Sequence, residues 1–258
     1  MIATLDAFEL SKSYRGKTAL DAFSLSIEPG QIHGLLGPNG SGKTTCLHIL
    51  TGLLAPDTGA VTIAGVAIES KKSRGLLGFA PDDLPLPGSL TGREYLEFHD
   101  AMRKRNDTKH AAVLAQALGI DADLEQHISE YSHGMRRKIQ IVAATMHHPQ
   151  VLILDEPFRG LDPDAAAVLR GLLVSFTHGG GSVLIATHDM LRAQRDCDEV
   201  TIMSAGITVA SGSPTLLVSA HPESETLEDV FLGVTGLLRD SAARSQSIEN
   251  LFERPNHV

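Results

Sequence analysis

The chain has 258 residues, of which 42% are hydrophobic, so it can bury a substantial core and its length allows one or two domains. Its net charge of −9 and its 4% of aromatic residues argue against a nucleic-acid groove, which needs basic patches interleaved with aromatic side chains. The two cysteines, Cys46 and Cys197, lack C-x-x-C spacing, so we expect neither a disulfide nor a metal cage, which fits a reducing compartment.

Short β segments open the chain. Residues 5–10, 22–27 and 61–68 alternate between apolar and polar side chains in the manner of half-buried strands. Turn residues at 28–30 and 56–59 separate these segments. The pattern predicts three short strands before the first long helical region.

A glycine-rich loop lies between a predicted strand at 32–36 and a helical run at 44–54. Residues 37–45 read Gly-Pro-Asn-Gly-Ser-Gly-Lys-Thr-Thr, a complete G-x-x-x-x-G-K-[ST] motif. Such a turn lets backbone N–H groups surround phosphate oxygens at the positive end of the helix. Lys43 can then reach the β- and γ-phosphates, and the Thr44 hydroxyl can ligate Mg²⁺. The predicted nucleotide-binding residues here are Gly37, Pro38, Asn39, Gly40, Ser41, Gly42, Lys43, Thr44 and Thr45.

The character of the sequence changes at Ser89, where helical patterns begin and continue to His148. Thr91 and Glu94 have the spacing of a capping box. Two apolar stripes follow, made of Tyr95, Leu96, His99 and Met102, and of Val113, Leu114, Ala117 and Leu118. We expect the basic clusters at 71–74, 103–105 and 136–138 to lie on solvated faces.

Residues 151–156 read Val-Leu-Ile-Leu-Asp-Glu, four apolar residues followed by two carboxylates. The run predicts a buried parallel strand, and open parallel sheets bind ligands beyond the carboxyl ends of their strands. Asp155 would then hold Mg²⁺ directly or through its water, and Glu156 would orient and polarise the attacking water. The alternative interpretation is a strand followed by an acidic turn without chemistry.

After Asp162 the sequence again alternates between helix and strand patterns. Asp162 and Pro163 are expected to begin a helix over 163–177, as N-cap and first helical residue. A glycine turn at 179–181 leads to an apolar strand over 183–186.

The last part of the sequence predicts small elements. Residues 199–210 have the pattern of a hairpin around Ala205-Gly206, and residues 226–236 that of a short amphipathic helix. The polar tail at 239–258 is expected to be disordered.

Residues 131–135, Tyr-Ser-His-Gly-Met, stand about twenty residues before the Asp-Glu strand end. Alone they could be any helix cap. In this place, and with the motifs above, the chain resembles the ATP-binding subunit of an ABC transporter over residues 5–238. The resemblance implies an α/β fold: a P-loop NTPase core with a mostly parallel sheet, an N-terminal antiparallel β layer and an inserted helical subdomain at about 89–148.

The resemblance also assigns roles to single residues. Ser132 and Gly134 would grip the γ-phosphate of ATP bound to the opposite subunit. Tyr14 falls where the family stacks an aromatic ring on adenine, and His188 matches the switch histidine that contacts the γ-phosphate. With Lys43 and Glu156 as the other catalytic residues, the implied activity is hydrolysis of ATP with Mg²⁺.

Two positions depart from the family pattern. Asp82 stands where the family usually has a glutamine that senses Mg²⁺ and touches the permease, and a carboxylate is still a hard oxygen ligand for that ion. His133 replaces the first glycine of the signature loop. We expect His133 to be a tolerated variant, the alternatives being a pH sensor or an inactivating change.

The implied function is ATP hydrolysis that powers a separate integral membrane permease. Residues 131–138 and 226–236 are similar to ATPases of drug-resistance-type (daunorubicin-like) exporters. Because no apolar run approaches the ~18–20 residues that span a bilayer, we expect a cytoplasmic subunit, peripheral on the inner face of the membrane. A second ATP-binding subunit is implied, with a homodimer favoured over a heterodimer.

Two alternatives stay open. The first is a non-transport ABC-type ATPase that acts as a soluble mechanical switch; such proteins usually carry two cassettes or a coiled coil, and this chain has one set of motifs and no sustained heptads. The second is a module that binds ATP without hydrolysing it, against which Glu156 and His188 argue.

Overall fold

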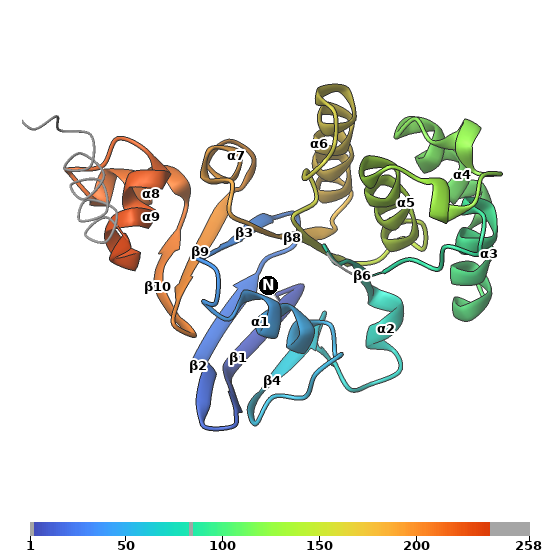
Figure 1. Ribbon diagram of the computed structural model, residues 1–258. Helices are drawn as coiled ribbons and strands as arrows, with labels where there is room; N and C mark the ends of the chain where they lie inside the picture. The colour runs from blue at the N-terminus through green and yellow to red at the C-terminus, as the bar shows by residue number, and fades with distance from the viewer. Residues whose placement is uncertain (1–2, 83–84, 238–258) are drawn as a thin grey trace, which may run out of the picture.

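A computed structural model describes residues 3–82 and 85–237 of the chain. Within them, helix α1 (Lys43–Leu50) lies between two β-sheets, and other helices cover the opposite face of the larger sheet (Figure 1). This arrangement confirms the predicted α/β fold. The polar tail predicted at 239–258 lies outside the described residues.

The larger sheet has six strands in the order β10-β9-β3-β8-β7-β6, and only the β9–β10 pair is antiparallel. Its strands are β3 (Ile32–Leu36), β6 (Leu77–Ala80), β7 (Val151–Asp155), β8 (Ser182–Thr187), β9 (Glu199–Ser204) and β10 (Ile207–Gly212). Leu36 pairs with Thr187, and Asp155 pairs with Ala186, so β3, β7 and β8 end at the same edge. This edge is where the phosphate-loop and carboxylate motifs meet.

Strand β7 explains why residues 151–154 are all apolar. Val151 and Ile153 belong to the core cluster around α1, whereas Leu152 and Leu154 belong to the cluster on the other face of the sheet. A parallel strand covered on both faces has no side for polar residues. The sequence returns to polar residues only where the strand reaches the edge of the sheet.

The smaller sheet has four antiparallel strands in the order β2-β1-β4-β5. They are β1 (Leu5–Tyr14), β2 (Lys17–Ile27), β4 (Thr58–Ile63) and β5 (Val66–Ala67). The predicted N-terminal antiparallel layer is therefore confirmed. The prediction of one strand over 61–68 was wrong, because Ala64 and Gly65 adopt φ values of 49° and 75° and turn the chain back on itself.

Helix α1 packs Cys46, Leu47 and Leu50 into the core between the sheets. It ends at Leu50 instead of the predicted residue 54, since Gly52 follows with φ 71°. The remaining elements of the core are α2 (Ser73–Leu76), α6 (Pro163–His178), α7 (Met190–Asp196), α8 (Pro214–Ala220) and α9 (Leu227–Thr235).

The segment between β6 and β7 is helical, at one end of the molecule (Figure 1). It holds α3 (Gly92–Arg103), η1 (Asp121–Asp123), η2 (Ile128–Glu130), α4 (Thr108–Ala117) and α5 (His133–Thr145). The Thr91–Glu94 capping box is present as predicted. Three stripe residues were misplaced, because Met102 is 70% exposed, Val113 is 63% exposed and Ala117 is also exposed. The domain limits of 5–238 and about 89–148 stay predictions.

Two buried histidines make the fold sensitive to acid. His33 is 3% exposed and His147 is 0% exposed, and burial lowers the pKa of each to about 4. Between pH 6.5 and 4 the unfolded chain therefore binds protons that the folded chain does not, so the free energy of unfolding falls as the pH falls. At pH 5 each histidine would destabilise the fold by up to about 2 kcal/mol.

This effect can be measured by urea unfolding at pH 7.5 and at pH 5. We expect His147→Gln, which can still donate to the Leu77 carbonyl 3.0 Å from Nε2, to lose less stability over this interval than the unchanged chain. His178→Gln, at an exposed position, serves as the control. Equal losses in all three proteins would contradict the assignment.

Candidate nucleotide site

The glycine-rich loop connects the end of β3 to the start of α1. A Cβ atom on Gly37 would lie 2.5 Å from Ser41 Oγ and 2.7 Å from the Met203 carbonyl oxygen, so only glycine fits there. Gly40 and Gly42 have φ values of 79° and 107°, in the left-handed region that favours glycine. The motif therefore has glycine where the backbone of this loop requires it.

Neighbouring backbone holds the loop from both sides. A Cβ on Gly42 would lie 2.4 Å from the Ala19 carbonyl oxygen, and a Cβ on Gly206, in the β9–β10 turn, would lie 2.7 Å from the same oxygen. The Gly206 N–H also donates to the Ser41 carbonyl at 2.8 Å. The β1–β2 and β9–β10 hairpins thus clamp the loop in its observed shape.

A cavity of about 940 Å³ lies in front of the loop. The predicted site residues that line it are Tyr14, Pro38, Asn39, Gly40, Gly42, Lys43, Thr44, Thr45, Asp82, Asp155, Glu156 and His188. Gly37 is not among the lining residues, and Ser41 is buried behind them with 2% exposure. Residues from β1, from the loop and from the carboxyl ends of β6, β7 and β8 therefore meet at one place.

Sequence reasoning missed other lining residues: Lys17, Thr18, Ala19, Leu47, His48, Phe79, Pro81 and Arg159. The β1–β2 hairpin pairs Tyr14 with Lys17 and Ser13 with Thr18. A hairpin assignment around residues 15–16 would have placed Lys17 and Thr18 beside Tyr14. No signal in the sequence points to Phe79 or Arg159.

Lys43 folds back over the loop. Its Nζ donates to the carbonyls of Gly37 and Pro38, the latter at 3.2 Å. Burial lowers the pKa of Lys43, and the nearby charges of Glu156 and Asp155 oppose that shift. The amine is therefore held inside the loop, on the same cavity as both carboxylates.

Glu156 is held rigidly at the end of β7. Its Oε1 accepts from the His188 backbone N–H at 2.9 Å and lies 2.6 Å from His188 Nδ1, and its Oε2 accepts from Thr187 Oγ1 at 2.9 Å. Glu156 also has φ 48°, a strained backbone angle for a residue with a side chain. The end of β8 therefore fixes this carboxylate, and Thr187 is a contact that the sequence did not suggest.

Asp155 precedes Glu156 at the end of β7, and both residues are partly buried. Burial, reinforced by the charges of Asp82 and Glu156, raises the pKa of Asp155 to about 6, against the opposing charge of Arg137. The Thr44 hydroxyl belongs to the same cavity. Two hard oxygen ligands suited to Mg²⁺ thus line this cavity.

Asp82 is paired with two arginines. One carboxylate oxygen accepts from Arg137 Nη2 and the other from Arg159 Nη1 at 2.7 Å. The expectation that the cluster at 136–138 lies on a solvated face was wrong for Arg137, whose side chain is 1% exposed. The physical reason is that α5 packs against β6, where Asp82 compensates the charge. The Mg²⁺-ligand role of Asp82 stays a prediction.

Ser132 and Gly134 do not line this cavity. Ser132 is exposed and is the N-cap of α5, with its Oγ accepting from the Met135 N–H at 3.2 Å. A Cβ on Gly134 would lie 2.8 Å from the Gly160 carbonyl oxygen, so the loop packs against the segment after β7. His133 is exposed and also contacts Gly160.

The comparisons with known proteins agree with this geometry. The family described as ABC transporter matches residues 20–159. The Nod factor export ATP-binding protein I of Rhizobium etli is 32% identical over 232 residues, which are 88% of this chain and 73% of that protein. The chain belongs to the ABC transporter family.

Two other similarities extend over most of the chain. The linearmycin resistance ATP-binding protein LnrL of Bacillus subtilis is 34% identical over 220 residues, which are 83% of this chain and 71% of that protein. A solved structure of an ATP-binding subunit of an ABC transporter superposes with a TM-score of 0.85 at 26% identity, over 90% of this chain and 99% of that one.

As a member of the ABC transporter family, the chain is an ATP-binding subunit with ATPase activity, and this supports the transporter interpretation over the soluble switch. Dimerisation and a membrane permease partner are general to such subunits.

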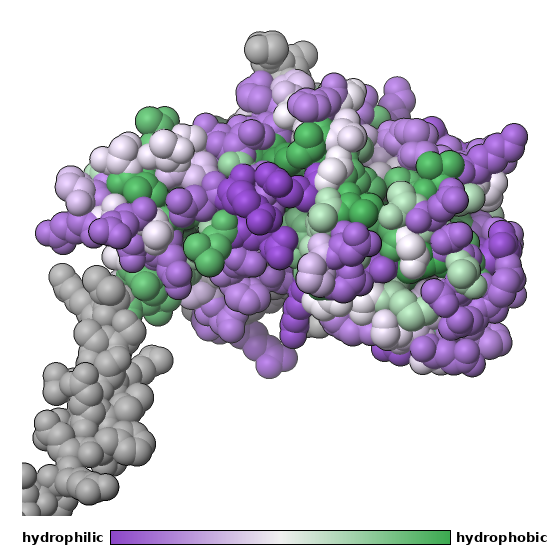
Figure 2. Space-filling view, turned by 90° about the horizontal axis from the view of Figure 1, so that it is seen from above, coloured by the Kyte–Doolittle hydropathy of each residue, from purple (hydrophilic) through white to green (hydrophobic). Residues whose placement is uncertain are grey.

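Among residues 3–82 and 85–237, no helix has both the length and the apolar character to cross a bilayer. On the face that carries α6 and α7, hydrophilic residues surround scattered hydrophobic groups (Figure 2).

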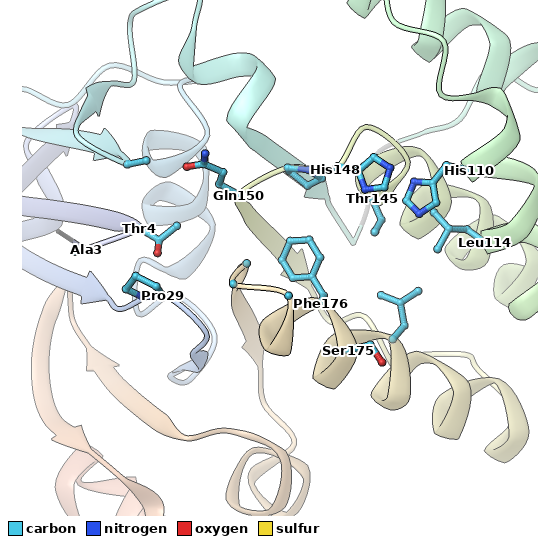
Figure 3. Close-up of a pocket in the computed structure, with 16 residues that line it drawn as sticks. Ala3, Thr4, Pro29, His110, Leu114, Thr145, His148, Gln150, Ser175 and Phe176 are labelled. Carbon is cyan, nitrogen blue, oxygen red and sulfur yellow. The ribbon is translucent and has the colours of Figure 1, made fainter. Parts of the chain in front are cut away.

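A second cavity, of about 900 Å³, lies near the start of β7, at the opposite end of the strands (Figure 3). The rings of His110 and His148 stack there with centroids 3.9 Å apart, facing Phe176 and Thr4 of the core. None of the predicted site residues lines it.

Proposed function

We propose that this ABC transporter subunit hydrolyses Mg-ATP in a site shared by two copies of the chain and thereby drives an exporting permease. The observation that carries the proposal is that some of the sequence motifs line the nucleotide cavity and others do not. Lys43, Asp155 and Glu156 converge on one cavity, whereas Ser132 and Gly134 are outside it. Since Ser132 is also exposed, it is free to face a nucleotide on another copy.

The roles proposed for the residues follow from their chemistry. Lys43 and the N–H groups at the start of α1 bind phosphate oxygens, because α1 has no side-chain cap of its own. Glu156 orients and polarises the attacking water, and His188, which holds Glu156, faces the terminal phosphate. Tyr14 ends β1 at the rim of the cavity with 46% exposure, which suits a ring that stacks on adenine.

Mg²⁺ fits the donor set of this site. Thr44 and Asp155 offer a hydroxyl and a carboxylate in the lining of one cavity. The ion, when bound, supplies a positive charge that polarises phosphoryl oxygens. We propose Thr44 and Asp155 as its protein ligands.

Export and location extend the proposal. The names of both relatives given above, a Nod factor export protein and a linearmycin resistance protein, favour movement of substrates out of the cell. We propose that the chain lies peripherally on the inner face of the cell membrane, bound to its permease. Recovery of a hydrophobic subunit with the tagged chain from solubilised membranes would support this; recovery with ribosomes instead would count against it.

The homodimer is tested by mixing two inactive variants. Lys43→Ala removes the phosphate-binding amine, and Ser132→Asp keeps an N-cap while placing a negative charge against phosphate. In a homodimer with a two-fold axis, each mixed pair has one site with both changes and one intact site. An equimolar mixture should therefore recover roughly one quarter of the unchanged ATPase rate, as half of the dimers are mixed and half of their sites are intact.

The control mixture combines Lys43→Ala with the double variant Lys43→Ala/Ser132→Asp, which offers no intact site in any pairing. It should stay inactive. If the first mixture is as inactive as its components while the unchanged chain hydrolyses ATP, two copies of this chain do not share a site.

A further inference from the structure

Asp82 lies just beyond β6, at the junction of the nucleotide cavity and the helical segment. Its carboxylate binds Arg137 of α5 on one side and Arg159, from the loop after β7, on the other. Arg137 also donates through Nη1 to the Pro81 carbonyl at 2.9 Å. Both oxygens of Asp82 are thus engaged with guanidinium groups.

The contacts continue from Asp82 into the nucleotide cavity. Asp82 lines this cavity together with Asp155 and Glu156, and the charge of Arg137 acts on all three carboxylates. Arg137 stands five residues after Ser132 in the same helix. The ion pair between Asp82 and Arg137 therefore joins the lining of the cavity to the helix whose N-cap is Ser132.

We infer that Asp82 is a positioning residue: it holds Arg137, and through it the N-terminal part of α5, in register with the nucleotide cavity. In this arrangement the carboxylate acts as the counter-ion of a buried cation and not as a metal ligand. The inference rests on the proposed function, because Ser132 must reach a nucleotide for its position to affect the rate.

Burial decides how the pair responds to mutation. Breaking a buried ion pair leaves one charge without compensation, whereas replacing both partners by neutral groups of similar volume is often tolerated. Without Asp82, Asp155 and Glu156 are the carboxylates among the described residues whose charges still act on the guanidinium of Arg137. The damage from losing Asp82 therefore depends on Arg137, and removal of both should be milder than removal of Asp82 alone.

The experiment is a double-mutant cycle with Asp82→Asn, Arg137→Met and the double variant. Asn keeps an oxygen that can accept a hydrogen bond or ligate a metal ion, but it lacks the negative charge of Asp. We expect Asp82→Asn to lower kcat by about ten-fold or more, and the double variant to recover to within about three-fold of the unchanged chain. Binding of a fluorescent ATP analogue to the monomer should change less than about two-fold, because the phosphate loop is untouched.

The alternative hypothesis, that Asp82 is a metal ligand, predicts different results. If Asp82 held Mg²⁺, the Mg²⁺ concentration for half-maximal rate would rise in both Asp82 variants, and Arg137→Met would restore nothing. A folded double variant as slow as Asp82→Asn would overturn the inference. Should Asp82→Asn alone fail to fold, a folded and active double variant would still support the inference, and a folded inactive one would contradict it.

Asp196 provides a matched control. Its carboxylate, 5% exposed, also accepts from two arginines, Arg170 at 2.8 Å and Arg195 at 2.7 Å, but it lies on α7, outside the lining of the nucleotide cavity. Asp196→Asn should lower Tm and leave kcat unchanged. Glu156→Gln is measured in parallel: full ATPase activity in that variant would reject the proposed function itself, whatever the cycle shows.

Discussion

Glu156→Gln is expected to reduce the ATPase rate by about 10²- to 10⁴-fold, the usual contribution of a positioned general base. Gln keeps the shape of the side chain: its one oxygen can still accept from the His188 N–H, and its NH2 group can donate to Thr187 Oγ1, but it cannot take a proton from water. The affinity for ATP should stay within about three-fold, since the phosphate loop is unaltered. Single-turnover assays and nucleotide titration measure the two quantities separately.

The same variant should form a stable dimer in the presence of ATP. When hydrolysis is blocked, the terminal phosphate remains in place for both copies to contact, so the interface does not reopen. Light scattering during size-exclusion chromatography with saturating Mg-ATP gives the mass directly. Glu69→Gln, the same chemical change at an exposed position, should behave like the unchanged chain. A Glu156→Gln chain that remains monomeric would contradict the shared site.

Lys43→Ala is expected to weaken ATP binding by about 10- to 100-fold, the range that corresponds to loss of a charge-assisted hydrogen bond. The amine lies inside the loop, bound to the carbonyls of Gly37 and Pro38, so no neighbouring side chain can replace it there. Turnover should fall further, because the charge is also absent when the phosphate is transferred.

Lys17→Ala is the matched control for Lys43→Ala, because Lys17 is an exposed lysine that lines the same cavity. It should change ATP affinity by less than about three-fold, since an exposed cation is well screened. Equal losses of affinity in the two variants, measured by equilibrium titration, would show that general positive charge and not the loop amine binds the phosphates.

The sequence was sufficient where one local rule decides the structure. Residues 151–154 are apolar on both faces of their strand because both faces are covered, and the Thr91–Glu94 capping box forms from neighbouring residues. Where several local preferences compete, the observed boundaries of the elements differ from the predicted ones. The turn at Ala64 requires φ 49° in a residue without a turn signature, and the strand predicted over 61–68 was split there.

The residues of the nucleotide site also differ in how well the sequence predicted them. Residues in a contiguous motif, such as Lys43 and Thr44, could be placed from their order alone. Arg137 could not, because its burial depends on Asp82, which stands 55 positions earlier in the chain. Thr187 was missed for a similar reason, since it holds Glu156 only after β7 and β8 have paired. Pairings between distant segments leave no local trace in one sequence.

The clamp on the glycine-rich loop has a thermodynamic consequence. Since the hairpins around Ala19 and Gly206 fix the loop by backbone contacts, its shape does not depend on a bound ligand. A receptor formed in advance loses little chain entropy when an anion arrives. In the proposed dimer, most of the free energy of nucleotide binding would therefore be available to favour association with the second copy.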